Sequence, residues 1–424
     1  MKLPAYPRYK PSGVEWLGDV PEHWDVKRLS YLATLKSGEN ITSEMIAEGG
    51  DYPVYGGNGL RGNYHKFTHH GHHALIGRQG ALCGNINYAS GKFWASEHAL
   101  VVSPLTEFVV VWMGELLRAM NLGQYSITAA QPGIAAEMIR GLRIPVPPLP
   151  EQQAVAAFLD RETGRIDRLV AKKRELIERL KEKRTALISR TVTRGLNPDA
   201  AFKPSGLDWL GEIPKHWGTP PLYTRYSIEL GKMLDASRIV GHALVHYLRN
   251  IDVQWDRINF DDLPEMDIEE RERGRFTLKE GDLLVCEGGE VGRSAIFKGR
   301  AEVTGFQKAL HRMRPLNLRE HPRFMFYTLT WASSQGIFFA EGNPNTIPHL
   351  TGEKLRRYRF PQPPLPEQAA IATYLDAETA KLDALAAKVE EAIERLQEYR
   401  TALITAAVTG KIDVRSSVDV RSCK

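Results

Sequence analysis

The sequence predicts an α+β protein that is an internal repeat: two mixed, mainly antiparallel domains and two long antiparallel coiled-coil helices, related by a pseudo-two-fold axis. Three observations support this prediction. A 15-residue motif occurs twice, a proline-rich helix start occurs twice, and each helix start precedes apolar residues at seven-residue spacing. A repeat of this size fixes the architecture before any local structure is considered.

The first repeated element, which we call the opening motif, is KPSGVEWLGDVPEHW at residues 10–24 and KPSGLDWLGEIPKHW at residues 203–217. The second, the helix-start motif, is PPLPEQ at residues 147–152 and 363–368. It is followed by ETGRIDRL and ETAKLDAL, then by KRTALI and YRTALI. The opening motifs lie 193 positions apart and the helix-start motifs 216, so the second stretch between them is longer by 23 residues.

These repeats predict five segments. The first domain covers residues 1–150 and the first long helix 151–195, the second domain covers 196–366 and the second long helix 367–411, and a tail covers 412–424. The inserts between the repeated parts, residues 31–143 and 224–359, share little sequence. A duplicated frame with different inserts suits a protein that performs one task on two different targets.

Each long helix begins where prolines end the preceding element, because proline fixes φ and cannot donate a backbone hydrogen bond. Glu151 and Glu367 then lie in the first turn, where the helix dipole favours an acidic side chain. Leu169 and Leu176 are expected to form a row beside the first stripe, and Leu385 and Ile393 lie beside the second. The predicted core of the helix pair is a heptad stripe on each helix: Leu159, Ile166, Leu180, Leu187, Leu375, Leu382, Val389, Leu396 and Leu403.

Charge supports pairing of the two helices. Residues 151–195 contain 12 Lys/Arg and 7 Asp/Glu, whereas residues 367–411 contain 5 and 8. Opposite net charges help two surfaces to associate. Solvated helix faces explain the charges alone equally well, so the prediction depends on the matching heptads.

Each insert shows short apolar runs separated by glycines, which is typical of strands and turns. Residues 72–102 and 281–313 have this pattern, and helices are expected near 109–120 and 323–335. Gly80 and Gly84 match Gly288 and Gly292 at a constant offset.

Familiar catalytic motifs are missing. Residues 57–62 match G-x-G-x-x-G, but a proline precedes them and no helix pattern follows, so we interpret them as a tight glycine-rich loop. No phosphate-binding G-x-x-x-x-G-K-[ST] is present, and the Asn-Pro pairs lack the aromatic residue of an amino-methyltransferase signature.

A histidine cluster at residues 65–73 could suggest a metal site. No cysteine or repeated histidine spacing accompanies it, and the second insert has no counterpart, so we favour an exposed polar turn leading into a strand. No metal site is predicted. Cys83 and Cys286 have apolar neighbours and are expected to be small core residues.

Polar side chains on or beside the glycine-rich loops are the candidates for DNA binding. Arg, Asn and Gln can form paired hydrogen bonds with base edges, and Lys and Arg also bind phosphate. A solvated loop side chain is the simpler interpretation of any one of them. The candidates are Asn58, Arg61, Arg78, Gln79, Asn85, Lys92, Arg249, Asn250, Arg293, Gln307 and Lys308.

The composition fits a folded protein, with 42% hydrophobic and 25% charged residues. No apolar run is long enough to cross a bilayer, and the N-terminal residues lack the apolar stretch of a secretory signal. Three widely spaced cysteines are typical of a reducing cytoplasm. A net charge of +5 is compatible with a nucleic-acid partner without requiring one.

In these motifs and their order, the chain resembles the specificity subunit of Type I DNA restriction–modification systems. The opening motif and its copy, the helix-start motifs, the ETGRIDRL and ETAKLDAL segments and the KRTALI and YRTALI helix ends carry the resemblance. It covers essentially the whole chain up to residue 411.

The resemblance implies a non-catalytic subunit with two target-recognition domains, each binding one half of an asymmetric, bipartite double-stranded DNA target. The paired helices would set the gap and bind two methylation subunits. Those partners would bring S-adenosylmethionine, and restriction subunits would bring ATP and Mg; this chain would hold no cofactor. Two half-sites about one helical turn apart suit a pseudo-symmetric protein, and the methylation partner would flip the target adenine.

Other interpretations make different predictions. A stand-alone DNA-binding protein, such as an anti-restriction decoy or a subunit without partners, would not need intact partner-binding helices. A coiled-coil scaffold with two protein-binding domains would expose apolar patches and bind its partners independently of salt, whereas DNA binding weakens steeply with salt. An enzyme using the histidine cluster would require a stoichiometric metal ion.

Overall fold

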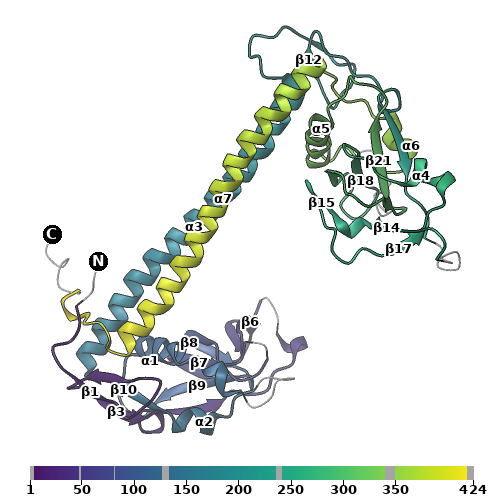
Figure 1. Cartoon of the computed structure of the whole chain (residues 1–424). Helices are drawn as coiled ribbons and strands as arrows, with labels where there is room; N and C mark the ends of the chain where they lie inside the picture. The colour runs from purple at the N-terminus through teal and green to yellow at the C-terminus, as the bar shows by residue number, and fades with distance from the viewer. Residues whose placement is uncertain are drawn as a thin grey trace. The chain divides into compact units, whose positions relative to one another are not determined.

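The structure is a computed structural model that describes residues 4–46, 49–80, 82–126, 133–234, 241–339 and 349–417. The chain divides into two units. Unit 1 contains Met1–Arg174 and Glu390–Lys424, and unit 2 contains Glu175–Val389. Each unit therefore holds one insert together with part of each long helix, α3 (Leu149–Arg194) and α7 (Leu365–Val408) (Figure 1).

Unit 1 opens with a hairpin of β1 (Tyr9–Pro11) and β2 (Asp19–Pro21), and β3 (Asp25–Arg28) pairs with β10 (Arg143–Val146). Its main sheet has the strand order β4-β9-β7-β8-β5-β6. Within the described residues these strands are β4 (Ala33–Ser37), β5 (Tyr52–Gly56), β6 (Gly59–Tyr64), β7 (His69–Gly77), β8 (Ile86–Ala95) and β9 (Ala99–Pro104).

Pairing in this sheet is antiparallel except between β5 and β8, among the strands described. α1 (Val110–Ala119) packs on β7 and β8, and α2 (Ala136–Gly141) lies against β4 (Figure 1). Apolar residues at the end of β7 and through β9 are buried, including Leu75 and Val101. The predicted mixed, mainly antiparallel sheet is confirmed.

Unit 2 repeats the plan with its strands divided differently. One sheet has the order β13-β21-β18-β19 and a second β17-β14-β20, where β14 and β20 run parallel. The strands are β11 (Phe202–Pro204), β12 (Glu212–Pro214), β13 (Tyr226–Leu230), β14 (Leu244–Leu248), β15 (Val253–Gln254), β16 (Arg257–Ile258), β17 (Glu265–Asp267), β18 (Leu283–Cys286), β19 (Ser294–Ile296), β20 (Thr304–Phe306) and β21 (Leu310–Pro315). The helices of this insert are α4 (Glu270–Phe276), α5 (Pro322–Ser334) and α6 (Gly352–Arg357).

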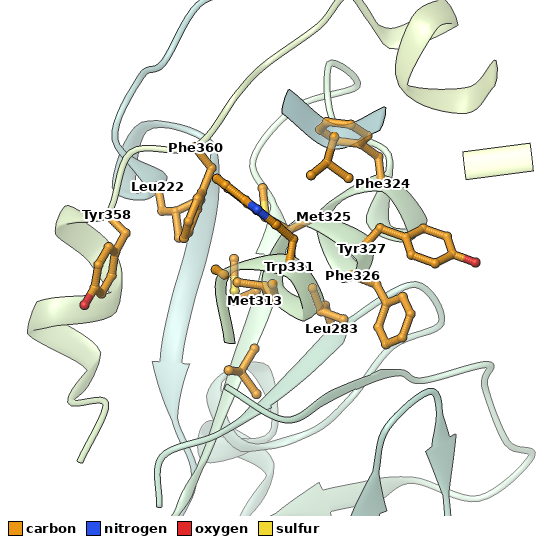
Figure 2. Packing of buried hydrophobic residues seen from close by; sticks show 14 of the residues in the cluster. Leu222, Leu283, Met313, Phe324, Met325, Phe326, Tyr327, Trp331, Tyr358 and Phe360 are labelled. Atoms are coloured by element: carbon orange, nitrogen blue, oxygen red, sulfur yellow. The ribbon is translucent and has the colours of Figure 1, made fainter. Parts of the chain in front are cut away.

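An aromatic core holds α5 against the four-stranded sheet of unit 2. Figure 2 shows side chains of α5, including Phe324 and Trp331, beside Leu283 of β18 and Met313 of β21. Phe360, which precedes the second helix-start motif, joins the same cluster. The core thus ties the sheet to the segment that leads into α7.

The helix-start motifs begin the long helices as predicted. The backbone amides of Glu151 and Gln152 donate to the carbonyl of Pro148, at 2.9 and 3.1 Å. Glu367 and Gln368 donate to Pro364 in the same way, at 2.9 and 3.0 Å. A proline is tolerated in the first turn because the amide hydrogen it lacks would have no partner within the helix.

Most of the predicted helix core is buried. Leu159, Ile166, Leu180, Leu375, Val389 and Leu403 are buried, and Leu187, Leu382 and Leu396 are half-buried. The expected neighbouring row was wrong on the first helix: Leu169 and Leu176 are 42% and 41% exposed, whereas Val170 and Ile177 are buried. On the second helix Leu385 is also exposed, at 45%, but Ile393 is buried as expected.

Three smaller expectations differ from the structure. The histidines at residues 69–73 lie within β7 rather than in a turn before it. Cys83 is half-buried, whereas Cys286 is buried as expected. Residues 411–417, expected to belong mainly to a tail, contact the N-terminal segment: the Asp413 amide donates to the Pro4 carbonyl at 2.7 Å.

Candidate nucleic-acid interface

Three loops of unit 1 meet at one edge of its sheet. They are the turn at residues 57–58 between β5 and β6, the loop 78–85 between β7 and β8, and the turn 96–98 between β8 and β9. The Arg78 amide donates to the His98 carbonyl at 2.8 Å. A Cβ atom on Gly57 would lie 3.0 Å from the carbonyl oxygens of both Gln79 and His98, so glycine permits this close approach.

Five of the six candidates in unit 1 lie in or beside these loops. Asn58 and Gln79 are exposed, and Asn85 is half-buried. The Arg78 guanidinium donates to the Ser37 hydroxyl at 2.9 Å, and that of Arg61 donates to the Ser43 hydroxyl at 3.4 Å. These side chains form one polar edge.

Lys92 is the exception. It lies on β8 opposite His70, and its ammonium group is 4.8 Å from the centre of the Phe67 ring and 5.8 Å from that of Tyr52. The structure therefore places Lys92 on an aromatic surface and not in the three loops.

Unit 2 brings three corresponding loops together: η6 (Asn250–Asp252) after β14, the loop 287–293 between β18 and β19, and the turn 307–309 between β20 and β21. The Asn250 amide group donates to the carbonyls of Gly288 and Ala309, at 3.1 and 3.3 Å. The two units use the same backbone contact here. The Ser96 backbone amide donates to the Tyr55 carbonyl at 2.8 Å in unit 1, and the Gln307 backbone amide donates to the Leu248 carbonyl at 2.9 Å in unit 2.

The five candidates of unit 2 are all at this edge, but they differ in what their side chains already contact. The Arg249 guanidinium donates twice to Asp252, at 2.9 and 2.8 Å, and these hydrogen bonds raise the pKa of Arg249. The Arg293 guanidinium donates to the carbonyl and side-chain oxygens of Asn250, at 2.9 and 2.8 Å. Within the described part of the chain, the side chains of Gln307 and Lys308 make no hydrogen bond or ion pair. DNA contact by any of the candidates stays a prediction.

The sequence did not reveal what the glutamates of the helix-start motifs do. Glu151 accepts hydrogen bonds from Trp24 Nε1 at 2.9 Å and His23 Nε2 at 2.6 Å, both in the opening motif. Glu367 accepts from Trp217 Nε1 at 3.0 Å and His216 Nε2 at 2.8 Å. The signal available in the sequence was that both opening motifs end in His-Trp and both helix-start motifs end in Glu-Gln.

The glutamines beside them position the insert helices. The Gln152 side-chain oxygen accepts from the Val109 amide at 2.9 Å, at the start of α1. The Gln368 oxygen accepts from the His321 amide, also at 2.9 Å, at the start of α5. An otherwise unpaired helix-start amide is thereby satisfied in each unit. Opening motif, long helix and insert are thus joined by the same contacts twice.

The described part of the chain offers no other obvious site. It contains no group of three or more His, Cys, Asp or Glu side chains that could hold a metal ion, so the β7 histidines form no such cluster. A helix long and apolar enough to cross a membrane is likewise absent from the described residues.

Comparison with known families agrees with this duplicated arrangement. A family model for the Type I restriction modification DNA specificity domain matches residues 21–179 and again residues 266–395. The chain belongs to the Type I restriction–modification DNA specificity family. Each match covers parts of an insert and of the long helix that follows it.

Known specificity subunits show how far the similarity extends. The EcoprrI specificity subunit of Escherichia coli is 42% identical over 139 residues, which is 32% of this chain and only 35% of that subunit. The putative specificity subunit S.HindORF215P of Haemophilus influenzae is 23% identical over 376 residues, covering 84% of this chain and 88% of that one. A chain solved in a study of complex assembly and conformational transition of the type I R-M system covers 93% of this one and 99% of its own length, with a TM-score of 0.70 at 17% identity. It shares the fold.

In this specificity subunit, two ion pairs join the long helices. Arg184 donates to Asp383 at 3.0 Å within unit 2, and Arg400 donates to Asp167 at 3.0 Å within unit 1. Arg400 and Asp383 follow Arg184 and Asp167 by the 216 positions that separate the helix-start motifs. The two pairs are therefore copies of one contact, and both have an antiparallel register.

Proposed function

We propose that this chain selects an asymmetric, bipartite double-stranded DNA target and binds two methylation subunits, without catalysing a reaction itself. Each unit would recognise one half of the target. In a complete system, restriction subunits would join the same assembly.

The contrast between a repeated frame and two different loop edges carries this proposal. Glu151 and Glu367 make matching contacts, as do Gln152 and Gln368. The turn that holds Glu97 and His98 in unit 1 holds Lys308 and Ala309 in unit 2. Since base edges are distinguished by the donors and acceptors they present, different side chains on one backbone frame favour different half-sites.

The duplicated frame also supports two copies of one partner type. Methylation subunits would supply S-adenosylmethionine and the adenine chemistry, and restriction subunits would supply ATP and Mg-dependent steps. The contribution of this chain would be affinity and placement, because an enzyme acting on a base within a duplex must first flip that base out.

Modification-sensitive sequencing tests the proposal. DNA would be compared from cells with the methylation subunit encoded beside this chain, in the presence and absence of the chain. A methylated-adenine motif in two unequal halves that requires the chain is the expected result. A single continuous motif, or none, would contradict it.

Salt dependence separates DNA binding from a protein scaffold. The logarithm of the DNA association constant should fall linearly with the logarithm of salt concentration, because phosphate contacts release counterions. An association insensitive to salt between about 50 and 200 mM would instead indicate a protein-binding scaffold.

A further inference from the structure

We propose that Gln307 and Lys308 are the side chains that select bases in the second half-site, and that Asn250 and Arg293 are positioning residues that fix the turn carrying them. This inference rests on the proposed function and adds which residues of unit 2 determine its specificity. It divides the five candidates of that unit into two roles.

The backbone of the turn 307–309 is held on several sides. The Gln307 amide donates to the Leu248 carbonyl at 2.9 Å, and the Lys308 amide donates to the Lys232 carbonyl at 2.8 Å. The Gln307 carbonyl accepts from Leu310 at 3.1 Å. These backbone groups already have partners, whereas the side chains of Gln307 and Lys308 remain available for a ligand.

Ala309 shows that the turn is held in an unfavourable conformation. Its φ is +116°, a region that residues with a Cβ atom rarely adopt. Its carbonyl accepts from the Glu287 amide at 2.9 Å and from the Asn250 side chain at 3.3 Å. Such strain persists only where surrounding contacts impose it, and it is common at ligand-binding sites.

Asn250 and Arg293 supply part of that constraint. The Asn250 side chain joins the loop 287–293 and the turn 307–309, and Arg293 holds the Asn250 carbonyl and side-chain oxygen. These hydrogen bonds already use the side-chain amide of Asn250 and the guanidinium of Arg293, which are the groups that would have to contact base edges. Cys286 lies against the same pair, where burial raises the pKa of its thiol and keeps it uncharged.

Gln307 and Lys308 have the chemistry for base recognition. Lys308 is exposed and Gln307 is half-buried. The turn therefore presents the shorter, more firmly placed amide of Gln307 beside the longer cationic side chain of Lys308. A glutamine can bind N6 and N7 of adenine together, and a lysine can bind O6 or N7 of guanine. The predicted ligand is a purine-containing edge of the major groove.

The corresponding turn of unit 1 supports this location. Its backbone makes the matching bond from Ser96 to Tyr55, yet it carries Glu97, paired with His98 at 3.1 Å. A carboxylate accepts from cytosine N4, whereas an ammonium group cannot. The two units therefore differ in charge at one structurally matched position.

Single substitutions test the two proposed specificity residues. In the complete methylating complex, Gln307→Ala should reduce discrimination at one position of the second half-site by about 5- to 150-fold, the range for one paired base contact. Lys308→Ala should relax a second position of that half-site. Modification-sensitive sequencing reports both halves at once, and the first half should not change.

The matched control is Lys298→Ala. Lys298 is also exposed but follows β19 at the opposite end of the β18–β19 pair from residue 286. It should leave both half-sites unchanged. If Lys308→Ala weakened binding uniformly and lowered the salt slope by about one, as for a phosphate contact, its selecting role would be excluded.

A rescue experiment tests the positioning residues. Asn250→Ala should relax the second half-site, and adding Ala309→Gly should restore much of it, because glycine adopts positive φ without strain. A simple loss of fold would not be restored in base preference by that change. Unaltered specificity in Asn250→Ala would overturn the positioning role.

The experiments distinguish a failure of the proposed function from a failure of this inference. If the wild-type complex methylates no bipartite motif, the proposed function fails. If it does, and Gln307→Ala and Lys308→Ala retain the same second half-site, only this inference fails.

Discussion

At the scale of single residues, unit 2 contains a buried charge pair where unit 1 is apolar. Arg225 donates to both carboxylate oxygens of Glu320, at 2.9 and 2.7 Å, and both side chains are almost fully buried. The positions that correspond in unit 1 are Leu32 and Phe108, also buried. The correspondence is structural, since the Leu105 amide donates to the Leu32 carbonyl in the same way that the Leu316 amide donates to the Arg225 carbonyl.

This pair predicts non-additive mutations. Arg225→Leu alone should lower the free energy of unfolding of unit 2 by about 3–5 kcal/mol, because it leaves a buried carboxylate without its partner. Arg225→Leu with Glu320→Phe, the unit 1 combination, should recover part of that loss, because apolar residues can replace a buried pair. Recovery should be incomplete, because the Tyr226 hydroxyl and the Gln362 amide lose Glu320 as their acceptor. Calorimetric unfolding of the full chain would measure both. A double variant as unstable as the sum of the singles would contradict the argument.

His311 predicts a pH dependence. It is fully buried, its Nε2 lies 2.7 Å from the Leu350 carbonyl, and burial lowers its pKa, opposed by Glu287 and reinforced by Arg356. The unfolded chain binds a proton near pH 6.5, while the folded chain does so only at lower pH. The unfolded state then holds more protons, so stability should fall as pH drops below about 6.5.

The comparison variant is His311→Gln, whose amide can keep the donor to Leu350. Its unfolding temperature should change less between pH 7.5 and 5.5 than that of the wild type, with other histidines contributing equally to both. Identical pH dependence in the two proteins would show that His311 is not responsible.

At the scale of elements, the segment 411–417 stabilises unit 1. Val414 is fully buried, the Lys411 ammonium group donates to the Asp19 carbonyl at 2.6 Å, and Arg415 lies 3.8 Å from Glu151. Gly410, with φ of +73°, turns the chain here, and a Cβ atom on it would meet the Pro21 ring at 2.5 Å. The end of α7 is thus joined to the opening motif.

Removing residues 411–424 should destabilise unit 1 by about 1.5–3 kcal/mol from Val414 alone, the usual value for a buried aliphatic side chain. Ser416→Ala, which removes an exposed side chain of the same segment, is the matched control and should leave the unfolding temperature unchanged. The transition of unit 2 should not shift in either variant. Equal effects of the truncation and of Ser416→Ala would show that the contacts of 411–417 are unimportant.

The long helices show what could be predicted from the sequence and what could not. The seven-residue stripe from Leu159 indicated the buried side correctly, because a heptad repeat persists only where two helices meet. Its neighbouring row was ambiguous. Leu169 lies three positions after Ile166 and Val170 four, and both spacings place residues on one face. Val170 is buried in the structure, so the choice of Leu169 for the buried row was wrong.

The loop edges show a different limit. Asn58 and Gln79 were candidates because of their residue types, and the structure brings their loops together through the close approach of Gly57 to the Gln79 carbonyl. Asn250 and Arg293 make contacts within the protein, between loops 38 to 59 positions apart in the sequence. No local sequence pattern encodes such contacts. Sequence therefore found the edge but could not separate a supporting side chain from one available to DNA.

At the scale of the whole molecule, the duplicated frame constrains how its length could change. Asp167 and Arg184 in α3 are separated by the same number of positions as Asp383 and Arg400 in α7. The two cross-helix ion pairs exist together only because these separations match. A change in one helix alone must break one ion pair and shift the apolar stripes.

Paired insertions follow from that constraint. One heptad inserted between Lys172 and Arg184, together with one between Lys388 and Arg400, keeps both ion pairs and adds about 10 Å at 1.5 Å per residue. If the helices set the gap between half-sites, the methylated motif should keep both halves and gain about 3 bp of spacer, at 3.4 Å per base pair. The α3 insertion alone should lower the unfolding temperature and abolish or blur the motif. Replacing the same seven residues without changing the length controls for local sequence, and a stable paired variant with the original spacer would exclude the helices as the determinant of the gap.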